Sequence, residues 1–194
     1  MPDIILIRHG ETHWNREKRL QGHADSPLTL KGIAQAQAYG RTIAPLVGAG
    51  WRVVTSPLGR CVQTAAILCE TAGLPFGAVE KDERLKEVGT GTFSGQLRAD
   101  MERAHPELFG AGLDAWYFRC PGCESHAAMA ARLSSWLAER RDGDKLVVVS
   151  HGVAGKMLRG LYAGLDPAEA LAADSPQDAV YRLSAGAVER ITCI

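Results

Sequence analysis

The sequence predicts an α/β protein with three layers, in which helices cover both faces of a mainly parallel central sheet. Short runs rich in Val and Ile alternate with longer stretches at helical spacing, and each run is followed by a turn and a helix. Helical crossovers between buried strands are typical of parallel neighbours. The chain has 194 residues, of which 46% are hydrophobic and 23% are charged, as expected for one globular domain over residues 1–194.

Three runs are predicted to be buried parallel strands, because continuous apolar runs of this length are typical of strands covered on both faces. They are Ile4–Ile7, Trp51–Ser56 and Leu146–Val149. Near the end of the chain, Val180–Leu183 and Ala187–Ile191 flank the tripeptide Ser-Ala-Gly. This pattern predicts a hairpin at the edge of the sheet.

Four long helices are predicted between and after these strands. Thr29 is placed to cap a helix that ends near Pro45 or Gly48, and residues 58–72 form a second helix closed by Gly73. The other two follow from apolar residues at helical spacing, namely Met129, Leu133, Trp136 and Leu137, and then Val153, Met157, Leu158, Leu161 and Leu165.

The stretch from about Gly89 to Gly122 does not follow this alternation. It contains five of the 12 aromatic residues of the chain, which are Phe93, Phe109, Trp116, Tyr117 and Phe118. We interpret the stretch as a small insertion that caps one end of the sheet. Its aromatic side chains either line a pocket or form the small core of the cap, and the sequence leaves both alternatives open.

The composition argues against several classes of partner. The 22 Lys and Arg residues balance the 22 Asp and Glu residues, so the basic excess typical of nucleic-acid binding is absent. No apolar run approaches the roughly 20 residues of a membrane span, and the first residues do not resemble a secretory signal. Five cysteines suit an extracellular disulfide framework poorly. We therefore expect a cytoplasmic protein without nucleic-acid or membrane partners.

Basic residues follow the carboxyl ends of all three predicted parallel strands. Arg8 and His9 follow the first strand, Arg60 comes about one helical turn after the second, and His151 follows the third. Ligands of open α/β sheets bind outside the carboxyl ends of the strands, where helix N-termini add N–H groups and positive dipoles. We therefore expect these four side chains to form one electropositive pocket for a dianionic phosphoryl group.

The residue types at this edge suit phosphoryl chemistry. A guanidinium group holds two phosphoryl oxygens at once, and a neutral histidine has a nitrogen lone pair that attacks phosphorus. Gly10 and Gly152 follow the histidines and allow backbone N–H groups to approach a ligand. Asn15 is a candidate for a hydrogen bond to the transferring group or for orienting the loop. Glu87 is the best candidate for the proton donor to the departing alkoxide.

These motifs resemble those of the histidine phosphatase superfamily, in its phosphoglycerate-mutase-like branch. The resemblance covers essentially the whole chain. It is carried, in order, by Arg8-His9-Gly10-Glu11-Thr12 with Trp14-Asn15, Gln21-Gly22, Asp25-Ser26-Pro27-Leu28-Thr29, Ser56-Pro57-Leu58-Gly59-Arg60 with Gln63-Thr64-Ala65, Leu85 with Glu87, Pro121-Gly122 with Glu124-Ser125, and Ser150-His151-Gly152.

The resemblance implies a role for each catalytic candidate. His9 would be the nucleophile that forms a phosphohistidine, and Glu87 would protonate the leaving oxygen and then activate water. Arg8, Arg60 and His151 would hold the phosphoryl oxygens, and no metal or other cofactor is required because these groups neutralise the charge. The candidate substrate-binding residues are Asn15, Gln21, Gly22, His23 and Gly152.

Departures from the family pattern favour hydrolysis over mutase activity. Val88-Gly89-Thr90 stands where cofactor-dependent mutases carry an arginine and a tyrosine, and the chain is short for their additional insertions. Phe93-Ser94-Gly95 replaces a frequent Trp-Glu-Gly, which changes one wall of the pocket. We expect a metal-independent hydrolase of a small cytoplasmic phosphomonoester. A phosphoglycerate mutase and a non-catalytic protein that binds a phosphorylated ligand are the alternatives.

Two further patterns have structural interpretations. His13 lies four residues after His9, a zinc-binding spacing on a helix, but the preceding strand and Gly10 predict a loop, and no third ligand is apparent. Cys120 and Cys123 have the spacing of a redox or zinc motif, but no second pair accompanies them. We interpret both cysteines as structural.

Overall fold

The computed structural model describes residues 1–109 and 115–194. Its sheet has the strand order β3-β2-β4-β1-β5-β6, in which the first four strands are parallel and β5 and β6 form an antiparallel hairpin at the edge. The predicted α/β class, mainly parallel sheet and edge hairpin are confirmed. The strands are β1 (Asp3–Arg8), β2 (Trp51–Thr55), β3 (Glu80–Lys81), β4 (Lys145–Ser150), β5 (Ala179–Ser184) and β6 (Ala187–Thr192).

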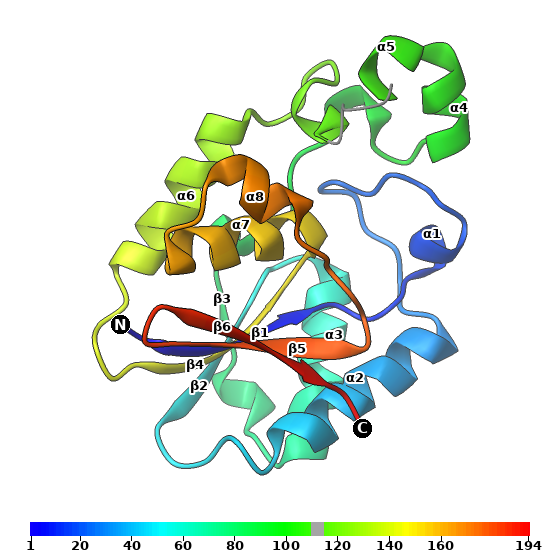
Figure 1. Cartoon of the computed structure of the whole chain (residues 1–194). Helices are drawn as coiled ribbons and strands as arrows, with labels where there is room; N and C mark the ends of the chain where they lie inside the picture. Colours follow the sequence, from blue (N-terminus) through cyan, green and yellow to red (C-terminus); the bar gives the residue numbers. More distant parts are fainter. Residues whose placement is uncertain (110–114) are drawn as a thin grey trace.

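Helices cover both faces of the sheet, so the three predicted layers are present (Figure 1). One face packs against α2 and α3, and the other packs against α6 and α7, with α8 next to α7. The described helices are α1 (His13–Arg16), α2 (Leu30–Ile43), α3 (Gly59–Ala72), α4 (Arg98–Ala104), α5 (Pro106–Phe109), α6 (His126–Ala138), α7 (Gly152–Ala163) and α8 (Pro167–Ala172).

Alternate residues of each central strand enter opposite layers of the core. In β1, Ile5 and Ile7 pack in the cluster that contains Tyr39 of α2 and Leu68 of α3. Ile4 and Leu6 pack in the cluster that contains Trp136 of α6 and Leu158 of α7. Because both faces are buried, the inner residues of β1 and β4 are all apolar, and the polar side chains that can reach a ligand come at or just after their carboxyl ends.

The helix boundaries follow the predicted caps, with one difference in the fourth helix. The Thr29 side chain accepts a hydrogen bond from the Gly32 N–H at 3.0 Å and begins α2, and left-handed Gly73 ends α3. The spacing that predicts the fourth helix runs to Leu165, and Leu161 and Leu165 are 37% and 41% exposed. Helix α7 ends at Ala163, so Leu165 lies beyond it.

The cap lies at one end of the sheet, beside the loops that follow the parallel strands (Figure 1). Its described part contains α4, α5 and two short 3₁₀ helices, Gly91–Phe93 and Trp116–Phe118. Both alternatives for its aromatic residues hold: Phe93 is buried in a small core, whereas Trp116 and Tyr117 line a cavity. Positions 110–114 of the predicted cap lie outside the described residues.

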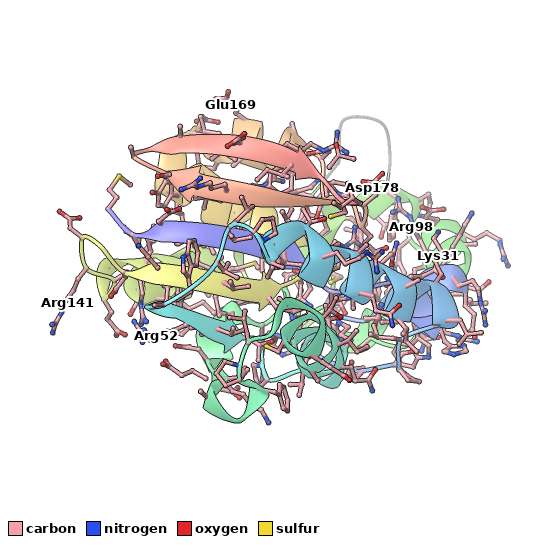
Figure 2. All side chains as sticks on the ribbon, turned by 90° about the horizontal axis from the view of Figure 1, so that it is seen from below. Lys31, Arg52, Arg98, Arg141, Glu169 and Asp178 are labelled. Atoms are coloured by element: carbon pink, nitrogen blue, oxygen red, sulfur yellow. The ribbon has the colours of Figure 1, made fainter. Side chains whose placement is uncertain are left out.

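The charged side chains labelled in Figure 2 lie on the outside of the layers. The labelled examples, all exposed, are Lys31, Arg52, Arg98, Arg141, Glu169 and Asp178. Across the described residues, no helix combines the length and apolar character of a membrane span.

Two glycines let the loop after β1 pack directly on the first turn of α2. A Cβ on Gly10 would lie 2.3 Å from the Gly32 carbonyl oxygen, and a Cβ on Gly32 would lie 2.1 Å from the Glu11 carbonyl oxygen. Since real Cβ atoms do not approach backbone oxygens so closely, neither position accepts a side chain without a backbone shift. This contact sets the position of the loop that begins with His9.

We predict that Gly32→Ala lowers the free energy of unfolding by about 1–3 kcal/mol, because the overpacking outweighs the helix preference for alanine. Gly48→Ala is the matched control, since a Cβ there meets nothing within 4 Å. Urea denaturation measures both variants. Equal stability of the two variants would contradict the close contact.

Candidate active site

His9 lies just beyond the carboxyl end of β1 and is 3% exposed. Its Nδ1 lies 2.8 Å from the Gly10 carbonyl oxygen. A carbonyl oxygen only accepts, so Nδ1 carries the proton and Nε2 keeps the lone pair. Burial lowers the pKa of His9 well below its usual value, and the charges of Arg60 and Arg8 lower it further. The imidazole is therefore neutral near pH 7.

Arg8 is the last residue of β1, and its guanidinium group is largely buried. Its Nη1 donates to the Ser175 carbonyl oxygen, and its Nε has no hydrogen-bond partner among the described residues. Burial lowers the pKa of Arg8, while the Glu87 carboxyl group acts in the opposite direction. A buried donor without a partner is costly, so this Nε–H is available to an anion.

Arg60, in the first turn of α3, is 1% exposed and joins three segments of chain. Its Nη2 donates to the Gly22 carbonyl oxygen at 2.8 Å, and its Nη1 donates to the Ala24 carbonyl oxygen at 2.7 Å and to Asp25 at 3.1 Å. Its Nε donates to His151, so one Nη2 hydrogen has no partner among the described residues and is left for a ligand. From α3, Arg60 therefore holds the 22–25 loop, and it lines the same cavity as His9.

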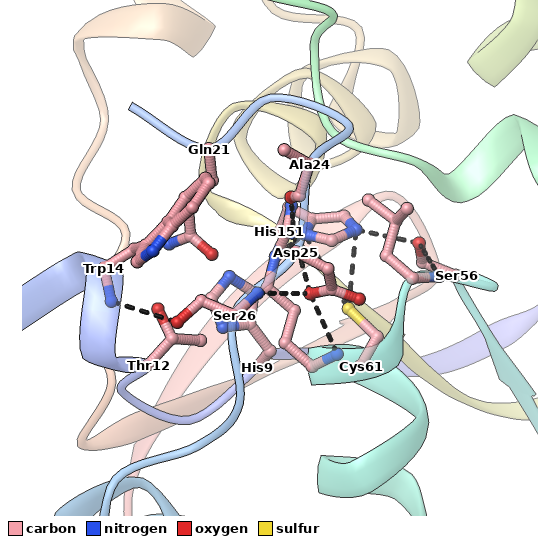
Figure 3. Close-up of polar contacts among 12 residues, drawn as sticks. His9, Thr12, Trp14, Gln21, Ala24, Asp25, Ser26, Ser56, Cys61 and His151 are labelled. Atoms are coloured by element: carbon pink, nitrogen blue, oxygen red, sulfur yellow. Dashed lines mark hydrogen bonds and ion pairs between the residues drawn. The ribbon is translucent and has the colours of Figure 1, made fainter. Parts of the chain in front are cut away.

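His151 follows β4 and lies edge-on to His9, with ring centroids 5.3 Å apart. Its Nδ1 accepts from Arg60 Nε at 3.2 Å, so its proton is on Nε2, which lies 2.8 Å from Ser56 Oγ (Figure 3). Burial lowers its pKa well below the usual value, and Arg60 and His9 add to this effect. Because a phosphoryl oxygen accepts, it would bind the Nε2–H of His151 in place of Ser56.

The Glu87 carboxyl group lies over the first turn of α7. Its oxygens accept from the N–H groups of Val153 at 3.1 Å, Ala154 at 3.0 Å and Val88 at 3.1 Å. A Cβ on Gly152 would lie 3.5 Å from Glu87 Oε2 and 3.7 Å from Arg8 Cζ. The helix N-terminus thus fixes Glu87 beside Arg8.

Arg132 and Glu124 hold the segment that carries Glu87, and sequence reasoning missed this function. Arg132 Nη1 donates to the Lys86 carbonyl oxygen at 2.8 Å, and Nη2 donates to the Glu87 carbonyl oxygen at 3.1 Å. The same guanidinium group makes a two-bond pair with Glu124 at 2.6 and 2.8 Å. The position of Glu124 within a family motif was the available signal; nothing in the sequence marked Arg132, on α6.

The predicted substrate-binding residues divide into two groups. Asn15, Gln21 and Gly22 line a cavity of about 530 Å³ together with His9, which we call the His9 cavity. Asn15 also orients the loop, because its Oδ1 accepts from the Thr12 N–H at 3.1 Å. Gln21 Oε1 is buried and has no partner within the described residues. Thr90 Oγ1, which the sequence did not single out, is in the same condition in the same cavity.

His23 and Gly152 are placed differently. His23 is exposed, is not among the residues that line the His9 cavity, and lies with Nε2 2.8 Å from the Glu87 carbonyl oxygen. Its contact is therefore to the Glu87 segment. Gly152 lines a second cavity of about 860 Å³, which we call the Lys156 cavity and which meets the His9 cavity along Arg8 and Glu87.

Comparison with known proteins identifies the family. Residues 4–189 match the model of the histidine phosphatase superfamily (branch 1), so the chain belongs to this superfamily. The chain is 34% identical over 172 residues to a probable phosphoglycerate mutase, GpmB, of Salmonella paratyphi C (strain RKS4594), covering 85% of this chain and 76% of that protein. The family and the enzyme class predicted from the motifs, a histidine phosphatase, are confirmed.

Solved structures share the fold. Mycobacterial glucosyl-3-phosphoglycerate phosphatase, solved with VO3, is 28% identical with a TM-score of 0.80, covering 99% of this chain and 97% of that one. The α-ribazole phosphatase of Shigella flexneri is 24% identical with a TM-score of 0.80, covering 98% and 95%, and this likeness concerns the fold alone.

The lowered pKa of His9 predicts a pH-dependent stability. Below about pH 6.5 the unfolded chain protonates this histidine but the folded chain does not, so the free energy of unfolding falls by up to about 1.4 kcal/mol per pH unit for each such group. Between pH 6.5 and 5, the loss measured by urea denaturation is expected to be larger in the native protein than in His9→Gln. Equal losses would show that folded His9 titrates normally.

Proposed function

We propose that the protein hydrolyses phosphomonoesters of small molecules through a phosphohistidine on His9, without a metal ion. The observation that carries the proposal is the neutral His9 imidazole, whose Nδ1 proton is bound by Gly10 while Arg8, Arg60 and Glu87 line the same cavity. The set contains a nucleophile, positive charge for phosphoryl oxygens and a carboxyl group for proton transfer.

The reaction takes place in two displacements. In the first, His9 Nε2 attacks phosphorus, the P–O bond to the alcohol breaks, and protonated Glu87 gives its proton to the departing oxygen. In the second, Glu87 takes a proton from water as the water oxygen attacks phosphorus and the P–N bond breaks. Arg8 and Arg60 stabilise the phosphoryl charge in both steps, which is the part that a metal ion takes in other phosphoryl-transfer sites.

Hydrolysis is favoured over phosphoglycerate mutase activity as the outcome of the second step. The name of the glucosyl-3-phosphoglycerate phosphatase supports it, and Val88-Gly89-Thr90 after the proposed acid supports it as well. The relative named as a probable mutase makes mutase activity the second candidate. Transfer of isotopically labelled phosphate between positions of one substrate, without release to water, would favour that candidate.

The proposal extends to the setting of the reaction. The balance of basic and acidic residues, together with five cysteines that are all free, supports a single-domain cytoplasmic enzyme acting on a small phosphometabolite. Nucleic acid is not proposed as a partner, because the chain has no basic excess.

Loss of the nucleophile is the direct test. We predict that His9→Ala lowers the hydrolysis of p-nitrophenyl phosphate by more than about a thousandfold, whereas His13→Ala, the matched histidine control in α1, keeps the native rate. Because acid hydrolyses phosphohistidine, the reaction is quenched in alkali, and the phosphorylated residue is then located by mass spectrometry. Abolition of activity by excess chelator would contradict the metal-free mechanism, and equal rates in the two variants would remove His9 from its role.

Arg132→Lys is predicted to impair proton donation by Glu87, because lysine cannot make the paired bonds that hold residues 86 and 87. The loss of kcat is expected to be about tenfold larger for glycerol phosphate, which leaves as a poor alkoxide, than for p-nitrophenyl phosphate, whose leaving group needs little protonation. Arg140→Lys is the control. Equal losses on the two substrates would indicate a general structural effect and not a positioning role.

A further inference from the structure

The Lys156 cavity is larger than the transferring group requires. It has a volume of about 860 Å³, against about 530 Å³ for the His9 cavity, and the two meet along Arg8 and Glu87. A single phosphoryl group next to His9 leaves the Lys156 cavity to the rest of the substrate. The chemistry of its lining therefore bears on which alcohol the phosphoryl group is attached to.

Positive charge predominates in this lining. Arg8, Arg98, Arg119 and Lys156 line the cavity, and Glu87 is the only acidic residue among the described residues that do so. Arg98 is paired outside the cavity with Glu102 at 2.6 Å. Lys156 Nζ donates to the Leu171 carbonyl oxygen at 3.0 Å, and in the described part of the chain no carboxylate lies within ion-pair distance of it.

The surroundings of Lys156 are short of negative charge. Burial lowers its pKa, and the positive charges of Arg159 and Arg8 lower it further, against weaker opposing effects of Asp174 and Glu87. Asp174 is itself engaged by Arg159 at 3.6 Å and by the Tyr181 hydroxyl group. An ammonium group in such a place is stabilised by an anion that a ligand brings.

The position of Lys156 relates this cation to the leaving group. Gly152 and Lys156 are four residues apart on α7 and both line the cavity, so they lie one turn apart on the same helix face. Glu87 and Arg8 lie over Gly152. Because Glu87 is the proposed proton donor to the leaving oxygen, the space between Glu87 and Lys156 is on the leaving-group side of the phosphorus atom.

We propose that Lys156 binds a second anionic group, a carboxylate or a phosphate, on the alcohol part of the substrate. The preferred substrates are thus phosphomonoesters with an anion at each end, and Trp116 and Val153 provide apolar walls for the carbon atoms between them. This inference rests on the proposed function for the position of the phosphoryl group. It adds a specificity-determining residue and a substrate class.

The test compares ligands that differ in one charge, in a His9→Ala background that leaves them intact. Calorimetry measures the affinity of 3-carboxyphenyl phosphate and of its neutral isostere, 3-carbamoylphenyl phosphate. We expect the carboxylate to bind about tenfold more tightly and Lys156→Met to remove this preference without weakening the neutral ligand. We expect Lys156→Arg to keep the preference for the carboxylate. Lys145→Met, a control at the exposed start of β4, should keep it as well. A third ligand, 3-phosphonophenyl phosphate, shows whether the site favours a carboxylate or a phosphate.

Each result decides between the subsite and the reaction. Equal affinity for the charged and neutral ligands, or a preference that persists in Lys156→Met, overturns the subsite. Retained binding of the neutral ligand shows that the Lys156→Met protein is folded. Hydrolysis by the native protein is measured separately. A charge preference without any hydrolysis supports the subsite and overturns the proposed hydrolase. Hydrolysis without a charge preference supports the hydrolase and overturns the subsite.

Discussion

The neutral imidazole of His9, buried in the cavity that Arg8 and Arg60 also line, is the feature on which the rest of the site depends. Arg8 and Arg60 supply positive charge for a phosphoryl group, and the same charge opposes protonation of the ring between them. Arg8 is held by a backbone carbonyl group, and Arg60 is held by two carbonyl groups and the Asp25 carboxylate. The Nε–H of Arg8 and one N–H of Arg60 have no partner among the described residues and are therefore left for an anionic ligand.

The backbone does much of the positioning around this cluster. The carboxyl ends of β1 and β4 bring the two histidines together, and the first turn of α7 supplies N–H groups that fix Glu87 beside Arg8. Arg132 of α6 also holds the Glu87 segment, because it donates hydrogen bonds to the Lys86 and Glu87 carbonyl oxygens. Three separate parts of the sheet edge thus set the positions of the phosphate-binding charges, the proposed nucleophile and the proposed proton donor, and movement of any one of them would change the geometry of transfer.

The sequence predicts β1, β2 and β4 and the residues at their ends, because a polar residue stands out where a buried apolar run ends. It misses the parallel strand β3, whose two residues are both exposed and form no apolar run. It does not reveal Arg132 or Lys156, since a basic residue on a helix resembles an ordinary surface residue until the fold shows what it faces. The length of the fourth helix was overestimated for a related reason: helical spacing gives the phase of α7 but not the residue at which it ends. The sequence leaves two alternatives open for Asn15 and for the cap aromatic residues, because composition and spacing do not tell whether a side chain contacts the protein or a cavity.

The stereochemistry at phosphorus tests the central claim most directly, because attack by His9 followed by attack of water is two inversions. The protein would be given a phosphorothioate monoester that is chiral through oxygen isotopes, and the configuration of the thiophosphate released in isotopically labelled water would be determined by ³¹P NMR. Our account predicts overall retention of configuration. Overall inversion would mean that water attacks the substrate directly, and would contradict a phosphohistidine on His9.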